Sequence, residues 1–452
     1  MKFLCGYNMN LDAVYSITRE DIAELLASVD PTVLFDSFQR SSGDINSISD
    51  LLAGLVGCMQ EGTGAEWFIQ DVSVFSFLME HFYERAVVRL GGNMAIMANV
   101  MSEMGAEEVV VNPVGDVGSI SPLISGEGVV FPEESDNDVK STFKGAKEKI
   151  VHFVFDFKKG LRFELFGKNI TVPRENRFIA TYDNVNTELY ISPAFEDYSR
   201  EYVKVANGAI VSGFNQLRSV YPDGSGPVEK FEKARSLMRG WKVLNSDLLV
   251  HAELGHFSTS ELAVFIFTEL SGIADSIGMN EDEIGMLFEI HGIPEERFQR
   301  IDSSIIVEAC VKCIRATGLK KMVVHTRDLI VSVFRDTVSS CDHEIQSLEF
   351  GIMCAAFFAA TGKLPLRSDL EDSVSEFSLS EYGLEQVGRV QALIDGNFDS
   401  CVGSGVGACG KYSDLNVCIL PTLICDDPIS TVGLGDTVMA ATFLRWVELL
   451  NS

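Results

Sequence analysis

The sequence predicts an α/β protein in which a large, mostly parallel sheet is flanked by helices and a smaller β-rich domain is inserted. Its 452 residues exceed the size at which a single hydrophobic core usually stops growing. Apolar strand-like and helical segments alternate along most of the chain, as they do in parallel sheets. Between residues 149 and 190, apolar and polar residues instead alternate with period two, which is typical of an antiparallel sheet with one solvated face.

The first part of the chain predicts a strand–turn–helix–strand unit. Residues 2–7 form an apolar strand, and residues 8–12 have the composition of a polar turn. The strand-like segment 84–90 leads through the glycine-rich residues 91–93 into an apolar helix, and a further strand follows at residues 107–115. This order is that of a parallel sheet.

The α/β rhythm resumes after residue 190 and continues to a last helix that begins near Gly435. A β-rich segment inside an α/β chain predicts a nucleotide-carrying large domain with a discontinuous lid. The expected large domain comprises residues 1–15, 91–148 and 191–452, and the expected lid comprises residues 16–90 and 149–190.

Net charge and the length of the apolar stretches exclude some classes of binding partner. The formal net charge is −29, from 65 acidic and 36 basic residues, whereas binding to nucleic-acid phosphates needs a cationic surface. The longest apolar stretch, residues 350–360, is shorter than the roughly 18 residues that span a bilayer. We therefore expect small-molecule substrates and neither nucleic acid nor membrane as partner.

The ten cysteines are too sparse and irregular for a disulfide framework, and no pair of CxxC motifs with zinc spacing occurs. This pattern predicts a protein of the reducing cytoplasm.

The sharpest motif is the turn before the last helix. Gly433 and Gly435 let backbone N–H groups approach an anion, and the N-terminus of the helix adds its positive dipole. Asp436 then stands where a carboxylate could accept the proton of a hydroxyl that attacks phosphorus. The alternative is that Asp436 only caps the helix.

A second glycine-rich segment, residues 405–411, has the spacing of a phosphate-binding P-loop. Tyr412 stands where that motif needs Ser or Thr, and a strand follows instead of a helix. We interpret residues 401–411 as a turn between strands.

Two acidic clusters offer ligands for Mg²⁺, which prefers a few carboxylates and retained waters. Glu253 follows His251 at the end of a strand, and Glu283 follows Asn280 at the start of a helix. Asn280 and Glu283 also fit a capping box, and both roles are compatible. No His/Cys spacing supports zinc at His251 or His325.

Candidate sugar-binding groups lie early in the chain. Asn10 and Asp12 follow the first strand, where an amide and a carboxylate could bind hydroxyls, although the same residues are ordinary in turns. Gly92 and Asn93 open a helix, and Glu66 is an isolated acid on the lid. Each of these signals is weak alone.

The lid reverses the charge of the chain. Residues 144–177 contain nine Lys/Arg and four Asp/Glu, an excess that would attract a phosphorylated substrate. Arg174 and Arg177 could each bind a phosphate with a forked guanidinium. The alternative is a set of solvated basic residues on an exposed sheet.

Taken in order, seven segments resemble the ADP-dependent phosphofructokinase/glucokinase family of archaea, within the ribokinase superfamily. The resemblance covers essentially the whole chain. The segments are GYNMNLDA at 6–13, GGN at 91–93, PRENRFI at 173–179, HAE at 251–253, NEDE at 280–283, VHTRD at 324–328 and STVGLGDT at 430–437.

The resemblance implies a ribokinase-like large domain with a lid, and it implies roles on the donor side. Asp436 is then the catalytic base, and Glu253, Glu283 and Asn280 organise Mg²⁺. The nucleotide ADP would contact His325, Val432, Gly433, Leu434 and Gly435, of which Gly433 and Gly435 shape the anion hole.

On the acceptor side, the resemblance implies transfer of the β-phosphoryl group of ADP to fructose 6-phosphate, and also to glucose, leaving AMP. An acidic residue at the position of Glu66 goes with glucose in this family, whereas basic lid residues go with the sugar phosphate. Because this chain has both, we expect dual specificity with phosphofructokinase activity dominant. The implied sugar-binding residues are Asn10, Asp12, Glu66, Gly92, Asn93, Arg174 and Arg177.

Two other functions stay open at this point. An ATP-dependent sugar or nucleoside kinase of the same superfamily would share the turn at Gly433 and the order of strands. A catalytically silent sugar sensor would keep the scaffold, but retention of Asp436 with both acidic clusters argues against it. The expected assembly is a monomer or a small homo-oligomer.

Overall fold

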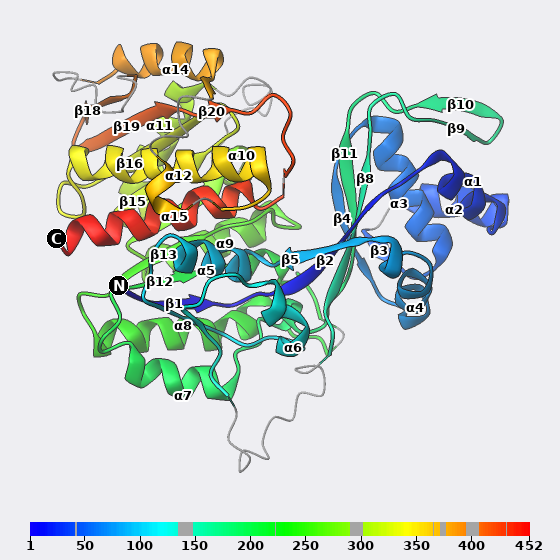
Figure 1. The fold of residues 1–452 in the computed structure, drawn as a ribbon, viewed down its shortest axis with the longest axis horizontal. Helices are drawn as coiled ribbons and strands as arrows, with labels where there is room; N and C mark the ends of the chain where they lie inside the picture. The colour runs from blue at the N-terminus through cyan, green and yellow to red at the C-terminus, as the bar shows by residue number, and fades with distance from the viewer. Residues whose placement is uncertain are drawn as a thin grey trace.

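Two large sheets organise the part of the chain that the structure describes (Figure 1). One has ten strands and forms the large domain, and the other has six strands and forms the lid. The computed structural model therefore confirms the predicted α/β class. It describes residues 1–40, 43–133, 148–221, 223–289, 302–364, 366–370, 377–394, 406–430 and 432–452.

The ten-stranded sheet is mostly parallel, as predicted. Its strand order is β18-β19-β16-β15-β14-β13-β12-β1-β6-β7, and the pairs from β15 to β7 are all parallel. The pairs from β15 to β18 are antiparallel. The strands are β1 (Lys2–Gly6), β6 (Glu108–Val111), β7 (Val129–Val130), β12 (Gly208–Val211), β13 (Leu249–Glu253), β14 (Ser276–Asn280), β15 (Lys321–His325), β16 (Leu329–Phe334), β18 (Ala408–Tyr412) and β19 (Leu415–Pro421).

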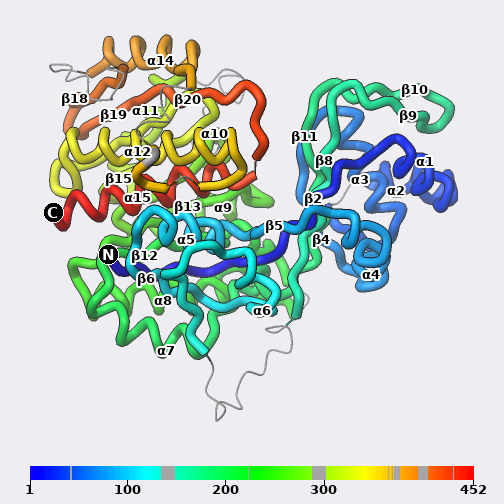
Figure 2. The backbone as a smooth tube through the Cα atoms, viewed as in Figure 1, coloured from blue at the N-terminus to red at the C-terminus, as the bar shows by residue number. Residues whose placement is uncertain are grey.

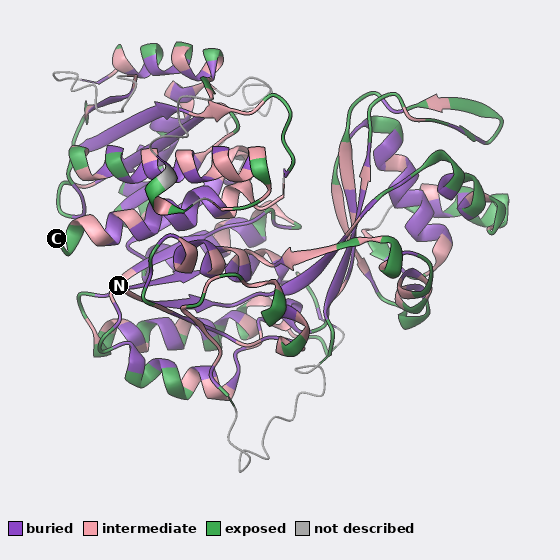
Figure 3. Cartoon of the chain, viewed as in Figure 1, coloured by how far each residue is buried: buried purple, intermediate pink, exposed green. Residues whose placement is uncertain are grey.

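Helices cover both faces of this sheet, so its strands are buried on both sides (Figure 3). In β1, Phe3 and Cys5 pack into the core shared with α5, α12 and α15, whereas Leu4 packs into the opposite core. The first face carries α5 (Asn93–Glu103), α12 (Cys341–Thr361) and α15 (Leu434–Leu450). The second core includes residues of α7 (Pro193–Tyr202), α8 (Pro227–Leu244), α9 (Ser260–Ser271), α10 (Glu281–Glu289), α11 (Ser303–Thr317) and α14 (Glu381–Gln391).

The lid sheet has one apolar face and one polar face. Leu11, Ala13, Phe153 and Phe155 point into a core that also contains the buried side chains of the lid helices. The strand order is β3-β4-β11-β8-β2-β5. The strands are β2 (Asn10–Ser16), β3 (Asp44–Ile45), β4 (Ala65–Ile69), β5 (Val87–Gly91), β8 (Val151–Phe157) and β11 (Asn176–Tyr182), and the helices are α1 (Arg19–Ala27), α2 (Pro31–Arg40), α3 (Ile48–Glu61) and α4 (Val72–His81).

The chain passes straight from β1 of the large sheet into β2 of the lid sheet (Figure 2). Residues 7–9, which form this connection, are held by amide side chains. Asn112 Nδ2 donates to the carbonyl of Tyr7 at 3.1 Å, and Asn186 Nδ2 donates to the carbonyl of Met9 at 3.1 Å. These bonds fix the path of the backbone between the two domains.

The structure corrects the predicted turn at residues 8–12. Asn10 opens strand β2, so Asn10 and Asp12 lie on a strand, and the lid begins at residue 10 rather than residue 16. The reason is the alternation of Leu11, Ala13 and Tyr15, which are buried in the lid core, with Asn10, Asp12 and Val14, which point to the other face.

The lid sheet is mixed rather than antiparallel throughout. Strands β8 and β11 are antiparallel, as predicted, and so are β9 (Arg162–Leu165) and β10 (Lys168–Thr171), which pair as a separate two-stranded sheet. The pairs β2–β8 and β4–β11 are parallel because the lid is assembled from segments that leave and re-enter it. Local alternation could predict each strand but not its partner.

Two further expectations concern the last strands. Residues 408–411 belong to strand β18 and not to a turn, because they pair antiparallel with β19, while residues 401–405 lie outside the described part. A disulfide joins Cys409 to Cys418 across these two strands.

Among the helices that the structure describes, none is long and apolar enough to cross a membrane.

Candidate active site at the carboxyl edge of the large sheet

Asp436 lies in the first turn of α15, next to the glycine turn that the sequence singled out. Gly433 is the N-cap and has a φ of 76°, a conformation that glycine adopts without strain. A Cβ on Gly435 would lie 3.0 Å from Cε1 of His325, so this glycine permits close packing of the imidazole. The helix therefore begins without a side-chain cap on its N–H groups and with a carboxylate beside them.

The first residue of another helix, α5, binds the carboxylate of Asp436. Asn93, the first residue of α5, donates from Nδ2 to Oδ1 of Asp436 at 2.8 Å. Asn8 orients Asn93 in turn, because its Nδ2 donates to Asn93 Oδ1 at 3.2 Å. The N-termini of α5 and α15 thus meet at Asp436, which joins two motifs that the sequence offered separately.

Burial raises the pKa of Asp436 to about 6. The hydrogen bond from Asn93 and the charge of His325 lower this pKa, whereas the charges of Glu253 and Asp12 raise it. The carboxylate is therefore close enough to both acidic residues to interact with them electrostatically. A base whose pKa lies near neutrality suits proton transfer from a hydroxyl group.

Glu253, Asn280 and His325 end the neighbouring parallel strands β13, β14 and β15. The carboxyl ends of parallel strands share one edge, where α/β proteins bind their ligands. Glu253 accepts from His325 Nε2 at 2.8 Å and lies 3.1 Å from His251 Nε2, and these two partners lower its pKa against the effect of burial. Glu253 is thus a buried carboxylate that stays ionised.

Glu283 completes the acidic cluster and also caps α10. Its Oε2 accepts from the backbone N–H of Asn280 at 2.8 Å, and its own N–H donates to Asn280 Oδ1 at 3.0 Å. The predicted capping box is therefore confirmed. Burial and the charge of Glu253 raise the pKa of Glu283 to about 8.

The donor set of this cluster fits a hard divalent cation. Glu253 and Glu283 are both nearly inaccessible to solvent, and the charge of Glu253 disfavours ionisation of Glu283. A cation between them would remove this repulsion, and carboxylate oxygens are the ligands that Mg²⁺ prefers. His325 bonds Glu253, so it is a member of this cluster.

The polar face of the lid sheet presents one row of side chains across four strands. Register places Arg89 opposite Asp12, Asp12 opposite His152, and His152 opposite Thr181. Thr181 Oγ1 donates to Glu66 Oε1 at 2.7 Å, which brings the predicted Glu66 to the end of the row. This row unites residues that are spread over more than one hundred positions.

The pKa of Asp12, which lies in this row, is raised well above its ordinary value. Burial raises its pKa to about 6, and Glu66 adds to this, while His152, Asn10 and Arg177 lower it. Asn10 Nδ2 donates to Asp12 Oδ1 at 2.7 Å. A Cβ on Gly91 would lie 2.4 Å from each of these two atoms, so Gly91 lets β5 lie against the pair. The carboxylate–amide pair can bind vicinal hydroxyls.

His152 is held from behind by a fully buried acid. Its Nε2 lies 3.1 Å from Asp183 Oδ2, and its Nδ1 lies 3.9 Å from Glu66. The Asp183 partner raises the pKa of His152 against the effect of burial. Asp183 also accepts from Asn186, whose amide binds Met9 in the connection between the domains.

The structure separates the two predicted arginines. Arg177 lies on the polar face of the lid and interacts electrostatically with Asp12 and Asp156. Arg174 is exposed and packs against Gly62 in the loop after α3. Four other basic residues of the lid are exposed in β9, β10 or the adjoining turn, as the alternative interpretation expected. They are Lys158, Lys159, Arg162 and Lys168.

Sequence reasoning missed Arg89, His152 and Asp183. Arg89 and His152 each interrupt an apolar strand at a position that faces Asp12, so period-two alternation was an available signal. Arg89 also reaches the loop before α15, since its Nη1 lies 3.5 Å from Ser430 Oγ. Asp183 carried no local signal, because its role depends on His152 in another strand.

Comparisons with known proteins agree over the full chain. A family model described as "ADP-specific Phosphofructokinase/Glucokinase conserved region" matches residues 1–445. The chain is 26% identical to the ADP-specific phosphofructokinase of Pyrococcus abyssi, over 99% of this chain and 97% of that protein. It is also 26% identical to the ADP-dependent glucose/glucosamine kinase of Pyrococcus furiosus, over 98% and 93%.

A solved structure supports the fold. The crystal structure of a phosphofructokinase from Pyrococcus horikoshii OT3 with AMP has a TM-score of 0.78 against this chain. The two share 23% identity, and the match covers 100% of this chain and 98% of the other. The arrangement of a large sheet domain with a lid is therefore shared with that protein.

Gly92 offers a test of how the site is assembled. Its φ is +78°, and a Cβ there would lie 2.6 Å from the backbone Cα of Met9. We expect Gly92→Ala to lower the free energy of unfolding by roughly 2–4 kcal/mol, because it adds a backbone collision to the strain of a left-handed φ. Urea denaturation followed by circular dichroism measures the change.

Gly160→Ala is the matched control, because Gly160 has a φ of +84° with nothing within 4 Å of its Cβ position. It carries the backbone strain alone and should cost about 1 kcal/mol. Equal losses in both variants would contradict the role assigned to the contact with Met9.

Proposed function

The chain belongs to the ADP-specific phosphofructokinase/glucokinase family, and we propose that it transfers the β-phosphoryl group of MgADP to fructose 6-phosphate and, less efficiently, to glucose. The observation that carries this proposal is the hydrogen bond between Asn93 and Asp436 at the glycine-capped start of α15. It holds a base of raised pKa beside N–H groups that suit a phosphoryl group. Relatives that match the whole chain act as phosphofructokinases and as glucose kinases, which supports both acceptors.

In the proposed reaction, Asp436 accepts the proton of the acceptor hydroxyl. That hydroxyl oxygen forms a bond to the β-phosphorus, and the bond from this phosphorus to the bridging oxygen breaks, so that AMP leaves. The backbone N–H groups at Gly433–Gly435 and the dipole of α15 stabilise the negative charge of the group in transfer. Asn93 keeps Asp436 oriented without neutralising it.

Glu253 and Glu283, with Asn280 behind them, would hold Mg²⁺. When bound, the ion neutralises phosphate charge and so favours attack on phosphorus. His251 and His325 keep Glu253 ionised through their hydrogen bonds, so this carboxylate needs no cation to stay charged. Contacts of Val432 and Leu434 with the nucleotide stay a prediction.

The row of polar side chains on the lid sheet, together with Asn10 and Arg177, would bind the sugar. Asp12 and Asn10 suit hydroxyl groups, Glu66 suits a neutral hexose, and Arg177 suits the phosphate of fructose 6-phosphate. Arg174 is exposed, so we assign the larger share of phosphate binding to Arg177. Water exclusion by the lid would limit hydrolysis of the donor.

The direct test is AMP release from MgADP by the purified chain, with fructose 6-phosphate and glucose supplied separately. ATP and pyrophosphate as alternative donors distinguish the proposed activity from that of an ATP-dependent sugar kinase. We expect turnover with ADP and the highest kcat/KM with fructose 6-phosphate. Turnover with ATP alone would overturn the donor assignment, and no turnover with any donor would indicate a sensor.

Asp436→Asn should lower kcat by about 10²–10⁴-fold, because the amide keeps the shape but cannot accept the proton. The KM for the sugar should change little. Asp247→Asn, at an exposed position of the large domain, is the control and should keep normal turnover. Near-normal kcat in Asp436→Asn would show that another group is the base.

The pH dependence of kcat should show an acidic limb near pH 6, where Asp436 gains its proton. Its pKa is raised from the ordinary value, so activity is present above this pH and falls about tenfold per unit below it. Asn93→Ala removes a bond that lowers this pKa, so the limb should move to higher pH. A limb that stays in place in Asn93→Ala would contradict the assignment.

Two lid variants should affect the two sugars in opposite ways. Arg177→Gln should lower kcat/KM for fructose 6-phosphate by about 10–100-fold, the size of a lost hydrogen bond to a charged group, and spare glucose. Glu66→Gln should lower kcat/KM for glucose more than for fructose 6-phosphate. Arg162→Gln and Glu164→Gln, both exposed on β9, are the matched controls. Parallel losses for both sugars would contradict the specificity assignment.

A further inference from the structure

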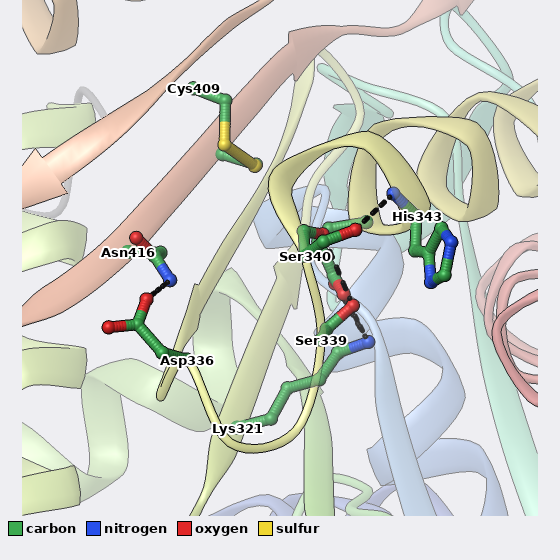
Figure 4. Close-up of a disulfide and its surroundings, with 9 residues drawn as sticks. Lys321, Asp336, Ser339, Ser340, His343, Cys409 and Asn416 are labelled. Carbon is green, nitrogen blue, oxygen red and sulfur yellow. Dashed lines mark hydrogen bonds and ion pairs between the residues drawn. A yellow bond between two sulfur atoms is a disulfide. The ribbon is translucent and has the colours of Figure 1, made fainter. Parts of the chain in front are cut away.

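Three cysteines from separate segments meet on the large domain. Cys409 of β18 and Cys418 of β19 are register partners with Cα atoms 4.2 Å apart, and they form the disulfide in Figure 4. Cys341 is the first residue of α12. The three sulfur atoms all lie within 4.8 Å of one another. We call these three residues the cysteine cluster.

The fold positions each sulfur independently. Strands β18 and β19 are joined by a short turn, so Cys409 and Cys418 are fixed by the ladder of the sheet. Cys341 is fixed by the start of α12, where Ser340 accepts from the N–H of His343 at 3.1 Å. Three thiols at one point therefore result from two rigid elements packed together, and not from one flexible loop.

The three cysteines differ in their exposure to solvent, and this difference suits a bound ion. Cys418 is fully buried and Cys409 is 6% exposed, whereas Cys341 is only half-buried. The cluster is thus closed on the side of the sheet and open on the side of the helix start. A bound ion would have three fixed sulfur ligands and one position accessible to water.

In the part of the chain that the structure describes, the charged side chains around the cluster are three acids and two lysines, an excess of one negative charge. Asp336, Asp342 and Glu344 all interact electrostatically with Cys341, and Lys411 opposes them. Lys411 is itself paired with Asp336 at 2.6 Å, and Lys321 is paired with Glu344 at 2.7 Å. Asp336 and the start of α12 lie around the disulfide in Figure 4. Sulfur ligands in an acidic setting select a soft divalent cation over an anion or a hard cation.

We propose that Cys341, Cys409 and Cys418 form a binding site for one thiophilic divalent cation such as Zn²⁺ when all three are reduced, and that the Cys409–Cys418 disulfide is the metal-free, oxidised form of this site. Reduction by a dithiol transfers two electrons and two protons to the two sulfurs, and the dithiol becomes a disulfide. The cation then replaces thiol protons, which pass to solvent. This site is separate from the carboxylates assigned to Mg²⁺.

The test uses the full-length chain, reduced with a dithiol and then freed of it without oxygen. Cd²⁺ is the probe, because its bonds to thiolates absorb in the ultraviolet and its bonds to carboxylates do not. We expect one equivalent to bind with this absorption, and Zn²⁺ to displace it. Mild oxidation that restores the Cys409–Cys418 disulfide, located by peptide mass mapping, should release the ion.

Variants locate the ligands. Cys341→Ser and Cys418→Ser should each weaken binding by at least ~100-fold, since even outer-shell changes cost up to that much. Cys354→Ser, which alters a buried thiol that contacts Met104, is the matched control and should bind normally. Binding is measured without nucleotide or sugar, so its outcome is independent of the kinase assay.

Three results would overturn the proposal. The reduced chain could bind no Cd²⁺ with sulfur character, which would leave the site as a disulfide alone. Cys341→Ser could bind as tightly as the unaltered chain, which would remove the third ligand. Cys354→Ser could abolish binding, which would move the ion to another group of cysteines.

Discussion

Burial of several carboxylates, at the carboxyl edge of the large sheet and on the polar face of the lid sheet, is the constraint that shapes this molecule. Burial raises the pKa values of Asp436, Asp12 and Glu283. Each receives hydrogen bonds from an asparagine side chain or backbone nearby, namely Asn93, Asn10 and Asn280. An amide satisfies a buried oxygen without adding a positive charge, so the acid stays able to take up a proton or a cation.

Glu253 differs from these three acids in its hydrogen-bond partners and in the direction of its pKa shift. Two imidazoles contact it, and its pKa is lowered. The site therefore contains acids of two kinds: Glu253, which histidines hold ionised, and acids whose pKa burial raises although amides donate to them. This contrast separates Asp436, which suits proton transfer, from Glu253, which suits a permanent charge, and it arises from the surroundings rather than from the residue type.

Close backbone approach makes these pairs possible. A Cβ on Gly91 or Gly278 would collide with Asp12 or Glu253, respectively, and a Cβ on Gly435 would lie 3.0 Å from His325. Each glycine lies on an element that passes directly over a functional side chain. The glycines thus set how tightly the lid strand, the large sheet and the last helix pack around the acids.

Much of this arrangement was predictable from local sequence. Asp436, Glu253 and Glu283 stand at ends of strands or helices, and such positions are legible from apolar periodicity and glycine turns. Asn10 and Asp12 were identified but assigned to a turn, because a strand that starts in a polar segment looks like one. His152, Arg89 and Asp183 became visible only with the register of the lid sheet, which joins segments far apart in the chain.

The cysteine cluster, like His152, Arg89 and Asp183, became visible only in the folded chain. No spacing motif links Cys341 to Cys409 and Cys418, because the helix and the two strands meet only in the folded sheet. Periodicity specifies which side of an element is buried, but it does not specify which distant element covers that side.

The place of β1 has a consequence for biosynthesis. It leaves the ribosome before the other strands of the ten-stranded sheet, yet it lies between β6 and β12, and β12 starts only at residue 208. At ordinary translation speeds, roughly 10–40 s separate the two. During that interval one edge of the nascent strand has no native neighbour, so the backbone of its apolar Phe3–Leu4–Cys5 stretch stays open to pairing with other chains until β12 is made.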